Sequence, residues 1–269
     1  MTDSIAHLGL LDDEELTLDI AALELAALDH PEIELTCYVD TVTALADRLA
    51  TVGGPSLSAM GRAEALSVVL AQEFGLGGDR ETYDDSRNAD LIAVLDRRRG
   101  LPVALSILYA SAARRIGWSA DILNTPGHVL MRLGHDTAPV IIDPFNHGEC
   151  VTPAQVARLL RDMGDDTRTV VDQVSPMSNR MVLVRLLTNQ ATRAEASGDG
   201  SRALILYARI TSIAPAYGHG WWERARLELR AGALLAARAS LSAMLEMTRD
   251  FELRLQISAA LEALAGTPS

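Results

Sequence analysis

Apolar residues recur at helical spacing along most of the first hundred positions. The pattern covers residues 11–30, 34–50 and 58–74, and glycines interrupt it at Gly53-Gly54 and again at Gly75. Polar residues fill 79–88, which predicts a loop before a further helix over 89–98. The first third of the chain is therefore predicted to be helical.

The pattern changes after Gly100. Residues 101–113 are apolar on almost every side, which predicts a helix buried at the centre of a domain, and this helix is expected to run to 116. Three short strand-like segments follow within about 119–142, separated by turn residues. Helix is expected again from Pro153, with Thr152 as its N-cap. The sequence thus predicts a mainly α protein with a small antiparallel β-sheet, an α+β fold.

The last third is helical and repetitive. Gly198 and Gly232 are 34 residues apart, and so are Ala203 and Ala237. A period of 34 residues is that of the tetratricopeptide repeat, a pair of antiparallel helices. Only about two copies fit, and the second is degenerate, which favours a short helical-repeat region. We expect two parts, residues 1–175 and residues 176–269.

Composition excludes several classes of function. The formal charge is −12, 48% of the residues are hydrophobic and 4% are aromatic. An acidic chain lacks the concentrated Lys and Arg that bind nucleic acid or anionic membranes. No apolar run is long enough to span a bilayer and the N-terminus has no signal-peptide pattern, so a cytoplasmic protein is expected. The two cysteines lack zinc-ligand spacing, Cys37 is expected in the core, and neither a metal nor a cofactor is predicted.

The chemically informative residues lie between the buried helix and Cys150. His128 begins a predicted strand and Asp143 ends another, so two antiparallel strands would bring them side by side. The segments Arg98-Arg99-Gly100-Leu101-Pro102, Pro126-Gly127-His128 and Ile142-Asp143-Pro144-Phe145 are similar in order and spacing to the transglutaminase-like superfamily. They most resemble its bacterial SirB-type branch, whose members carry tetratricopeptide-like helices after the core.

This resemblance implies a transglutaminase-like core within residues 1–175, followed by the helical repeats. In that family a Cys opens the buried helix, a His begins one strand and an Asp ends the next. The position of the Cys corresponds here to Pro102, which has neither a nucleophilic side chain nor a backbone N–H. The implied protein is a non-catalytic protein-binding or regulatory module that binds another protein through the repeats, whose exposed faces would also allow self-association.

The alternative hypothesis is that the protein is an enzyme. A hydrolase or acyl-transferase acting on amides, as papain-like and transglutaminase-like enzymes do, could use His128 and Asp143 with a different nucleophile. Ser106 lies one helical turn after Pro102, although a hydroxyl bonded back to a helix carbonyl is its commoner role. Cys150 follows Asp143 by seven residues and is the other candidate.

Further residues are expected to border the cleft or bind a partner. Tyr83 and Asn88 belong to the polar loop that the resemblance places beside the cleft. Arg99 ends a short basic run that would bind an anion or simply lie in solvent at a helix end. Trp221 and Trp222 form the densest aromatic pair, and we expect one ring to pack between helices and the other to anchor a partner.

Overall fold

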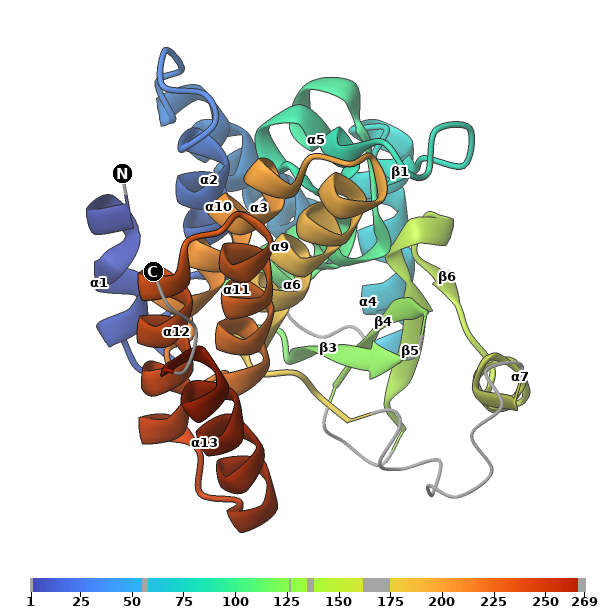
Figure 1. Ribbon diagram of the computed structural model, residues 1–269. Helices are drawn as coiled ribbons and strands as arrows, with labels where there is room; N and C mark the ends of the chain where they lie inside the picture. Colours follow the sequence, from blue (N-terminus) through green and yellow to red (C-terminus); the bar gives the residue numbers. More distant parts are fainter. Residues whose placement is uncertain (1, 55–57, 126, 135–137, 162–174, 266–269) are drawn as a thin grey trace. The chain divides into compact units, whose positions relative to one another are not determined.

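A computed structural model describes residues 2–54, 58–125, 127–134, 138–161 and 175–265 (Figure 1). Pro126, the first residue of the expected Pro-Gly-His segment, lies outside the described residues. The chain divides into two compact units. We call Asp13–Leu186 the core unit, and Met1–Asp12 together with Leu187–Ser269 the helical unit.

The core unit is helical at its start and carries the β-structure in its second half. Its helices are α2 (Leu18–Ala27), α3 (Thr36–Gly53), α4 (Ala59–Leu66), the π-helical η2 (Ser67–Glu73), the 3-10 helix η3 (Ser86–Ala89), α5 (Leu91–Arg97), α6 (Pro102–Arg115), the 3-10 helix η4 (Pro144–Asn146), α7 (Pro153–Arg161) and the first turns of α9 (Asn179–Ala196). Its strands are β1 (Gly77–Gly78), β2 (Arg99–Gly100), β3 (Ala120–Thr125), β4 (His128–Leu133), β5 (Val140–Asp143) and β6 (Glu149–Cys150). The predicted class, mainly α with a small antiparallel sheet, is confirmed.

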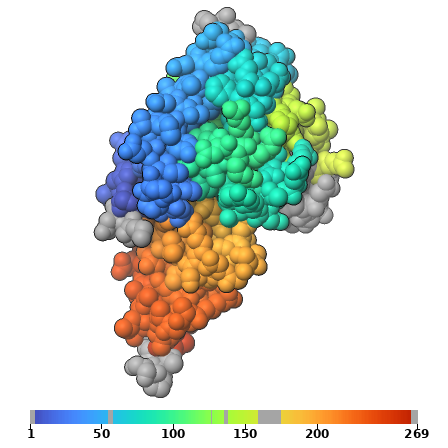
Figure 2. Space-filling model, turned by 90° about the horizontal axis from the view of Figure 1, so that it is seen from above, coloured from blue at the N-terminus to red at the C-terminus, as the bar shows by residue number. Residues whose placement is uncertain are grey.

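Helix α6 is the centre of the core unit. Every residue from Pro102 to Ala113 is buried, as expected for a helix without a polar face. It packs against α2, α3 and the first two strands of the sheet. On the face seen in Figure 2, the blue helix α2 and the blue-green segment around α5 lie side by side. Helices α2 and α3 and the sheet therefore cover α6, and α5 packs in turn on α2.

The larger sheet has the antiparallel order β3-β4-β5-β6. Ala120 pairs with Leu133 and Thr125 with His128, so β3 and β4 form a tight hairpin. Met131 then pairs with Ile142, and Ile142 with Cys150. This register brings the start of β4 and the end of β5, the two central strands, to the same end of the sheet.

A two-stranded parallel ladder, β1 with β2, joins two segments that precede and follow α5. Its glycines allow close packing. A Cβ added to Gly78 would lie 2.6 Å from the ring of Phe145, and one added to Gly77 would lie 2.5 Å from Cε1 of His147. The backbone of β1 can lie against η4 and the residue after it only because these side chains are absent.

The helical unit contains the 3-10 helix η1 (Thr2–Ile5), α1 (Ala6–Leu10), the rest of α9, α10 (Gly200–Ile213), α11 (Gly218–Arg230), α12 (Leu234–Met247) and α13 (Phe251–Ala265). Consecutive helices from α10 onward pack against one another. Gly198 and Gly232 each adopt a left-handed φ, +84° and +75°, just after α9 and α11. The residue after each glycine donates its N–H to the carbonyl five positions earlier, so the two turns have the same hydrogen-bond pattern 34 residues apart.

One expectation about the core is wrong. Cys37 is exposed rather than buried, because it lies in the first turn of α3 on the side away from Val42, Leu45 and Leu49, the residues of that helix that are buried.

Candidate functional site

His128, the first residue of β4, and Asp143, the last residue of β5, lie together at one end of the sheet. Nε2 of His128 is 2.8 Å from Oδ2 of Asp143, and the side chains are 18% and 8% exposed. A carboxylate offers only acceptors, so Nε2 carries the proton and donates it to Asp143. In the neutral ring Nδ1 is then the basic nitrogen, and it has no hydrogen-bond partner among the described residues.

The carboxylate of Asp143 is held on both oxygens. Oδ1 accepts from the backbone N–H groups of Phe145 and Asn146, and thus caps η4. Oδ2 accepts from the side-chain amide of Asn146 at 2.6 Å as well as from His128. With four donors, the carboxylate has one orientation, and it therefore orients the imidazole in turn.

Neighbouring residues also hold the backbone carbonyl and the ring of His128. The carbonyl of His128 accepts from the Thr125 hydroxyl at 2.7 Å and from the Arg185 guanidinium at 2.8 Å. Burial lowers the pKa of Arg185. The ring of Phe145 packs edge-on to His128 with centroids 6.0 Å apart. Neither Asn146 nor Arg185 was predicted, because neither stands in a segment that carries the family resemblance.

Pro102 is the first residue of α6 and is buried. The residue before it, Leu101, donates its N–H to the carbonyl of Asn88 at 2.8 Å. Proline suits this helical position because its missing N–H would have no acceptor within the helix. The same absence means that residue 102 offers neither a nucleophile nor an oxyanion-stabilising amide.

The two candidates for a nucleophile, Ser106 and Cys150, are not at the start of α6. Ser106 is on the second turn of α6 with 0% exposure, and its hydroxyl has no partner among the described residues. Cys150 pairs with Ile142, whereas its neighbour Glu149 pairs with Asp143. Since successive strand residues face opposite sides, Cys150 shares the sheet face of Ile142 and not that of Asp143. Its Sγ lies 3.5 Å from Sδ of Met60.

The loop before α5 is braced by a buried carboxylate that the sequence did not single out. Asp79, 5% exposed, accepts from the hydroxyl of Thr82 at 2.6 Å and from the guanidinium of Arg97 at 2.8 Å. The Thr82 hydroxyl, its amide and Arg97 hold the pKa of Asp79 well below its usual range, against the effect of burial. Arg97 also donates to Asn88 at 2.9 Å, and the side-chain amide of Asn88 donates to the carbonyl of Thr82 at 2.6 Å.

Asn88 therefore connects two parts of the site. Its side chain binds the loop and Arg97, while its carbonyl binds Leu101 at the start of α6. Tyr83, at 38% exposure, packs edge-on to Phe145 with centroids 5.8 Å apart. The predicted loop residues Tyr83 and Asn88 thus lie beside the elements that hold His128 and Pro102.

The remaining predicted residues are Arg99, Trp221 and Trp222. Arg99 is in β2 and donates to the carbonyls of Gly75 and Arg98. In the helical unit, Nε1 of Trp221 donates to the carbonyl of Pro215 at 2.8 Å, and the ring packs on the cluster formed by α11, α12 and α13. Trp222 is 38% exposed.

The described residues contain no group of three His, Cys, Asp or Glu side chains placed to hold a metal ion. Within the same residues, no helix is long and apolar enough to cross a membrane.

Comparison with known proteins gives both a family and relatives. The family model of the transglutaminase-like superfamily matches residues 36–188. A UPF0162 protein of Xylella fastidiosa (strain 9a5c) is 30% identical over 246 residues, covering 89% of this chain and 87% of that protein. A UPF0162 protein of Vibrio cholerae is 39% identical over 92 residues, 34% of either chain. F-box only protein 21 of Homo sapiens is 31% identical over 84 residues, which are 31% of this chain and 13% of that protein.

Proposed function

Because this chain belongs to the transglutaminase-like superfamily, together with the UPF0162 proteins, we propose that it is a member without thiol chemistry that binds another protein. We assign it to the SirB-type branch and interpret its helical unit as tetratricopeptide-like repeats. The core unit would then be a non-catalytic relative of the family's enzymes, and the helical unit would supply the binding surface.

The observation that carries this proposal is Pro102 at the first position of α6, while His128 and Asp143 keep a 2.8 Å hydrogen bond. Thiol catalysis in such a site needs a thiolate beside the imidazole at the start of the helix, where the helix dipole and the histidine lower the thiol pKa. No thiol is available there. The two cysteines of the chain are Cys37 in α3 and Cys150 on the sheet face of Ile142.

Replacement nucleophiles have little support. Ser106 is fully buried, so a substrate carbonyl could not reach its hydroxyl without movement of α6. Burial, and the nearby charge of Glu64, raise the pKa of the Cys150 thiol. A raised pKa lowers the thiolate fraction at neutral pH, which is the opposite of activation.

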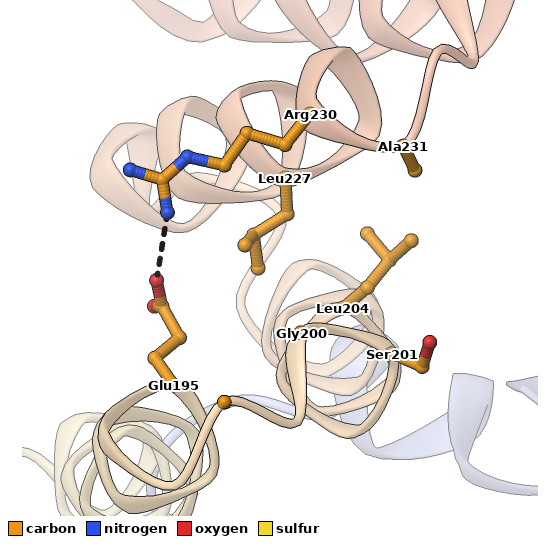
Figure 3. A pocket seen from close by; sticks show the side chains of 8 residues that line it. Glu195, Gly200, Ser201, Leu204, Leu227, Arg230 and Ala231 are labelled. Atoms are coloured by element: carbon orange, nitrogen blue, oxygen red, sulfur yellow. Dashed lines mark ion pairs between the residues drawn. The ribbon is translucent and has the colours of Figure 1, made fainter.

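A binding surface is available in the helical unit. A cavity of about 350 Å³ opens beside α10 and α11, and in Figure 3 Leu204 and Leu227 point toward the space between these helices. Arg230 lies at its edge, 68% exposed and 3.8 Å from Glu195, whose closer partner is Arg226 at 2.6 Å. The guanidinium of Arg230 is thus only loosely engaged. The occupant that fits is a peptide segment with an apolar side chain next to a carboxylate.

Restoring a thiol tests the interpretation of Pro102. In a Cys37→Ser/Cys150→Ser background, Pro102→Cys would place the only thiol of the chain at the start of α6. We expect iodoacetamide to alkylate it about ten-fold faster at pH 6 than in the same variant carrying His128→Ala, because a lowered pKa raises the thiolate fraction more than it reduces nucleophilicity. Equal rates with and without His128 would show that residue 102 is not the nucleophile position.

Binding is tested with a displayed library of random peptides, selected against the full chain. We expect enriched peptides that combine an apolar and an acidic residue, and we expect Arg230→Glu to abolish their binding. Arg238→Glu, on the exposed side of α12, is the matched control because it makes the same charge change away from the cavity. Failure to enrich any peptide, or equal loss in both variants, would refute a binding site at this cavity.

A second function is favoured by one observation, the complete orientation of His128 by Asp143. A hydrolase or acyl-transferase could use Nδ1 of His128 to activate water or another nucleophile. Such an enzyme would cleave amide or ester substrates at a rate that falls with His128→Ala. Our proposal expects wild-type protein and His128→Ala to show the same background rate, and no labelling by fluorophosphonate or iodoacetamide that depends on His128.

A further inference from the structure

A second cavity lies at the opposite end of α6 from Pro102. Its volume is about 260 Å³, and its walls come from the start of α2, the last turns of α6 and Asn179 at the start of α9. The last turns of α6 lie roughly 20 Å along the helix from its first residue. All these residues belong to the core unit, and none of them takes part in the His128 site.

Arg114 supplies a cation that donates no hydrogen bond to a carboxylate among the described residues. Its Nε donates to the carbonyl of Ala120 and one terminal nitrogen to the side-chain oxygen of Asn179, both at 2.8 Å. Both acceptors are neutral, and the other terminal nitrogen has no acceptor among the described residues. Burial lowers the pKa of Arg114, although Asp121 and Asp13 oppose this effect. A largely desolvated guanidinium whose hydrogen-bond acceptors are both neutral gains by meeting an anion.

Ser111 supplies an unsatisfied hydroxyl. It lies on the same helix as Arg114, lines the cavity, and is 7% exposed. Its Oγ is buried and has no hydrogen-bond partner among the described residues. A buried hydroxyl without a partner costs free energy. Rotation about the Cα–Cβ bond of Ser111 would turn this hydroxyl toward the cavity that the residue lines, where a ligand that accepts its proton would recover that cost.

The N-terminus of α2 faces the same cavity. Thr17, its N-cap, makes no side-chain capping bond, and Thr17 and Leu18 both line the cavity. The backbone N–H groups of Leu18 and Asp19 have no acceptor among the described residues. Free amides at the start of a helix, together with the helix dipole, favour an anion.

The acidic residues nearby are already engaged or lie at the edge. Asp19 accepts from the Arg115 guanidinium at 2.9 and 3.0 Å and from the amide of Ile20. Asp13 accepts from the backbone of Asn179 and Arg180. Asp121 pairs with Arg132. These hydrogen bonds do not remove the negative charges, although Arg115 and Arg132 balance those of Asp19 and Asp121. Glu14 is exposed, lines the cavity and adds a further charge that opposes an anion there.

We propose that this cavity binds a small molecule through one oxyanion group, a carboxylate or a phosphate, held by Arg114, the Ser111 hydroxyl and the free amides of α2. The volume leaves room for a small organic group beside the oxyanion. This site is separate from the proposed function, and the failure of either would leave the other standing.

Inorganic phosphate and acetate are the probes, titrated by calorimetry into the full chain at ionic strength matched with sodium chloride. We expect dissociation constants in the millimolar range for at least one of them. Ser111→Ala removes a hydroxyl without a partner, so it should fold at least as stably as the wild type and bind the anion about five-fold more weakly. Arg114→Gln should weaken binding about ten-fold or more, whereas Glu14→Gln should strengthen it about two-fold because it removes a repulsive charge.

The pattern across the variants decides the outcome. Weaker binding in Ser111→Ala, with stronger binding in Glu14→Gln, supports the site even if Arg114→Gln does not fold. Binding of phosphate but not acetate would identify a tetrahedral oxyanion, and the reverse would identify a carboxylate. No heat of binding for either anion up to about 20 mM, or equal affinity in the wild type and Ser111→Ala, would overturn the proposal.

Discussion

Replacing Asp79 with Asn should destabilise the core unit strongly, and the effect should depend on pH. Asp79 is 5% exposed, and its two oxygens accept from the amides of Glu81 and Thr82, the Thr82 hydroxyl and the Arg97 guanidinium, at 2.6 to 3.1 Å. In the Asp79→Asn variant one of these oxygens is replaced by an amide donor that faces other donors. Arg97 would then keep Asn88 as its one side-chain partner in the described structure.

Breaking a buried ion pair on one side costs about 3–5 kcal/mol. Arg97 is 26% exposed and can partly turn to water, so the lower end of that range applies. We therefore expect Asp79→Asn to reduce the free energy of unfolding by about 3 kcal/mol at pH 7, or to lower Tm by about 6–12 °C for a domain of this size.

The pH dependence follows from the depressed pKa of Asp79. A carboxylate whose pKa is lower in the folded state stabilises the fold above its unfolded pKa of about 3.9, and this contribution is lost as the pH falls below that value. The difference in stability between wild type and Asp79→Asn should thus be largest at pH 5–7 and shrink below about pH 4.

Urea unfolding at several pH values, followed by circular dichroism and tryptophan fluorescence, measures this difference. Glu73→Gln is the control, because Glu73 pairs with Arg48 on the surface and its loss should leave stability unchanged within error. A destabilisation by Asp79→Asn of less than about 1 kcal/mol, or one that is the same at pH 3 and pH 7, would refute the reasoning.

Two further predictions concern packing and titration. Gly78→Ala should cost about 1–3 kcal/mol in urea unfolding, because its Cβ would lie 2.6 Å from the ring of Phe145; Gly200→Ala, where a Cβ meets nothing within 4 Å, is the control, and equal effects would contradict the packing argument. Tyr38 should titrate at about 12 by absorbance at alkaline pH, because burial raises its pKa and its hydroxyl donates to Asp96. A pKa raised in the folded state stabilises the fold below about pH 10, and this contribution is lost as the pH rises toward 12. Asp96→Asn should lower the pKa of Tyr38, and an unchanged titration would be inconsistent with the hydrogen bond.

Local pattern accounts for what could be predicted of the fold. An uninterrupted apolar run ending at glycine can only be a buried segment, and α6 is buried from Pro102 to Ala113. The strands around His128 alternate with turn residues, and the structure has them in one antiparallel sheet. The pairing of β1 with β2 could not be predicted, because two-residue strands carry no periodicity and their glycines are explained only by the rings of Phe145 and His147.

The candidate site, too, could be predicted from the sequence only in part. Spacing on adjacent strands was enough to suggest that His128 and Asp143 meet, and the family resemblance placed Pro102 in the position of the thiol. Asn146 was missed although it lies three residues after Asp143, since a side-chain amide in a loop gives no signal of its own. Asp79 and Arg97 were missed because they are 18 positions apart and the segment between them follows no period that would bring them together.

The sequence by itself determined the helical class, the buried central helix and the absence of a thiol at its start, because these depend on residue type and local order. Only the tertiary structure decided which side chains share a site. Register placed Cys150 on the sheet face away from Asp143, and packing left Ser106 wholly buried. Packing also placed Ser111 and Arg114 beside one cavity. Among the described residues the Ser111 hydroxyl has no hydrogen-bond partner, and the Arg114 guanidinium donates to neutral acceptors. Burial and hydrogen-bond partners arise from contacts between segments distant in the chain, so no local pattern encodes them.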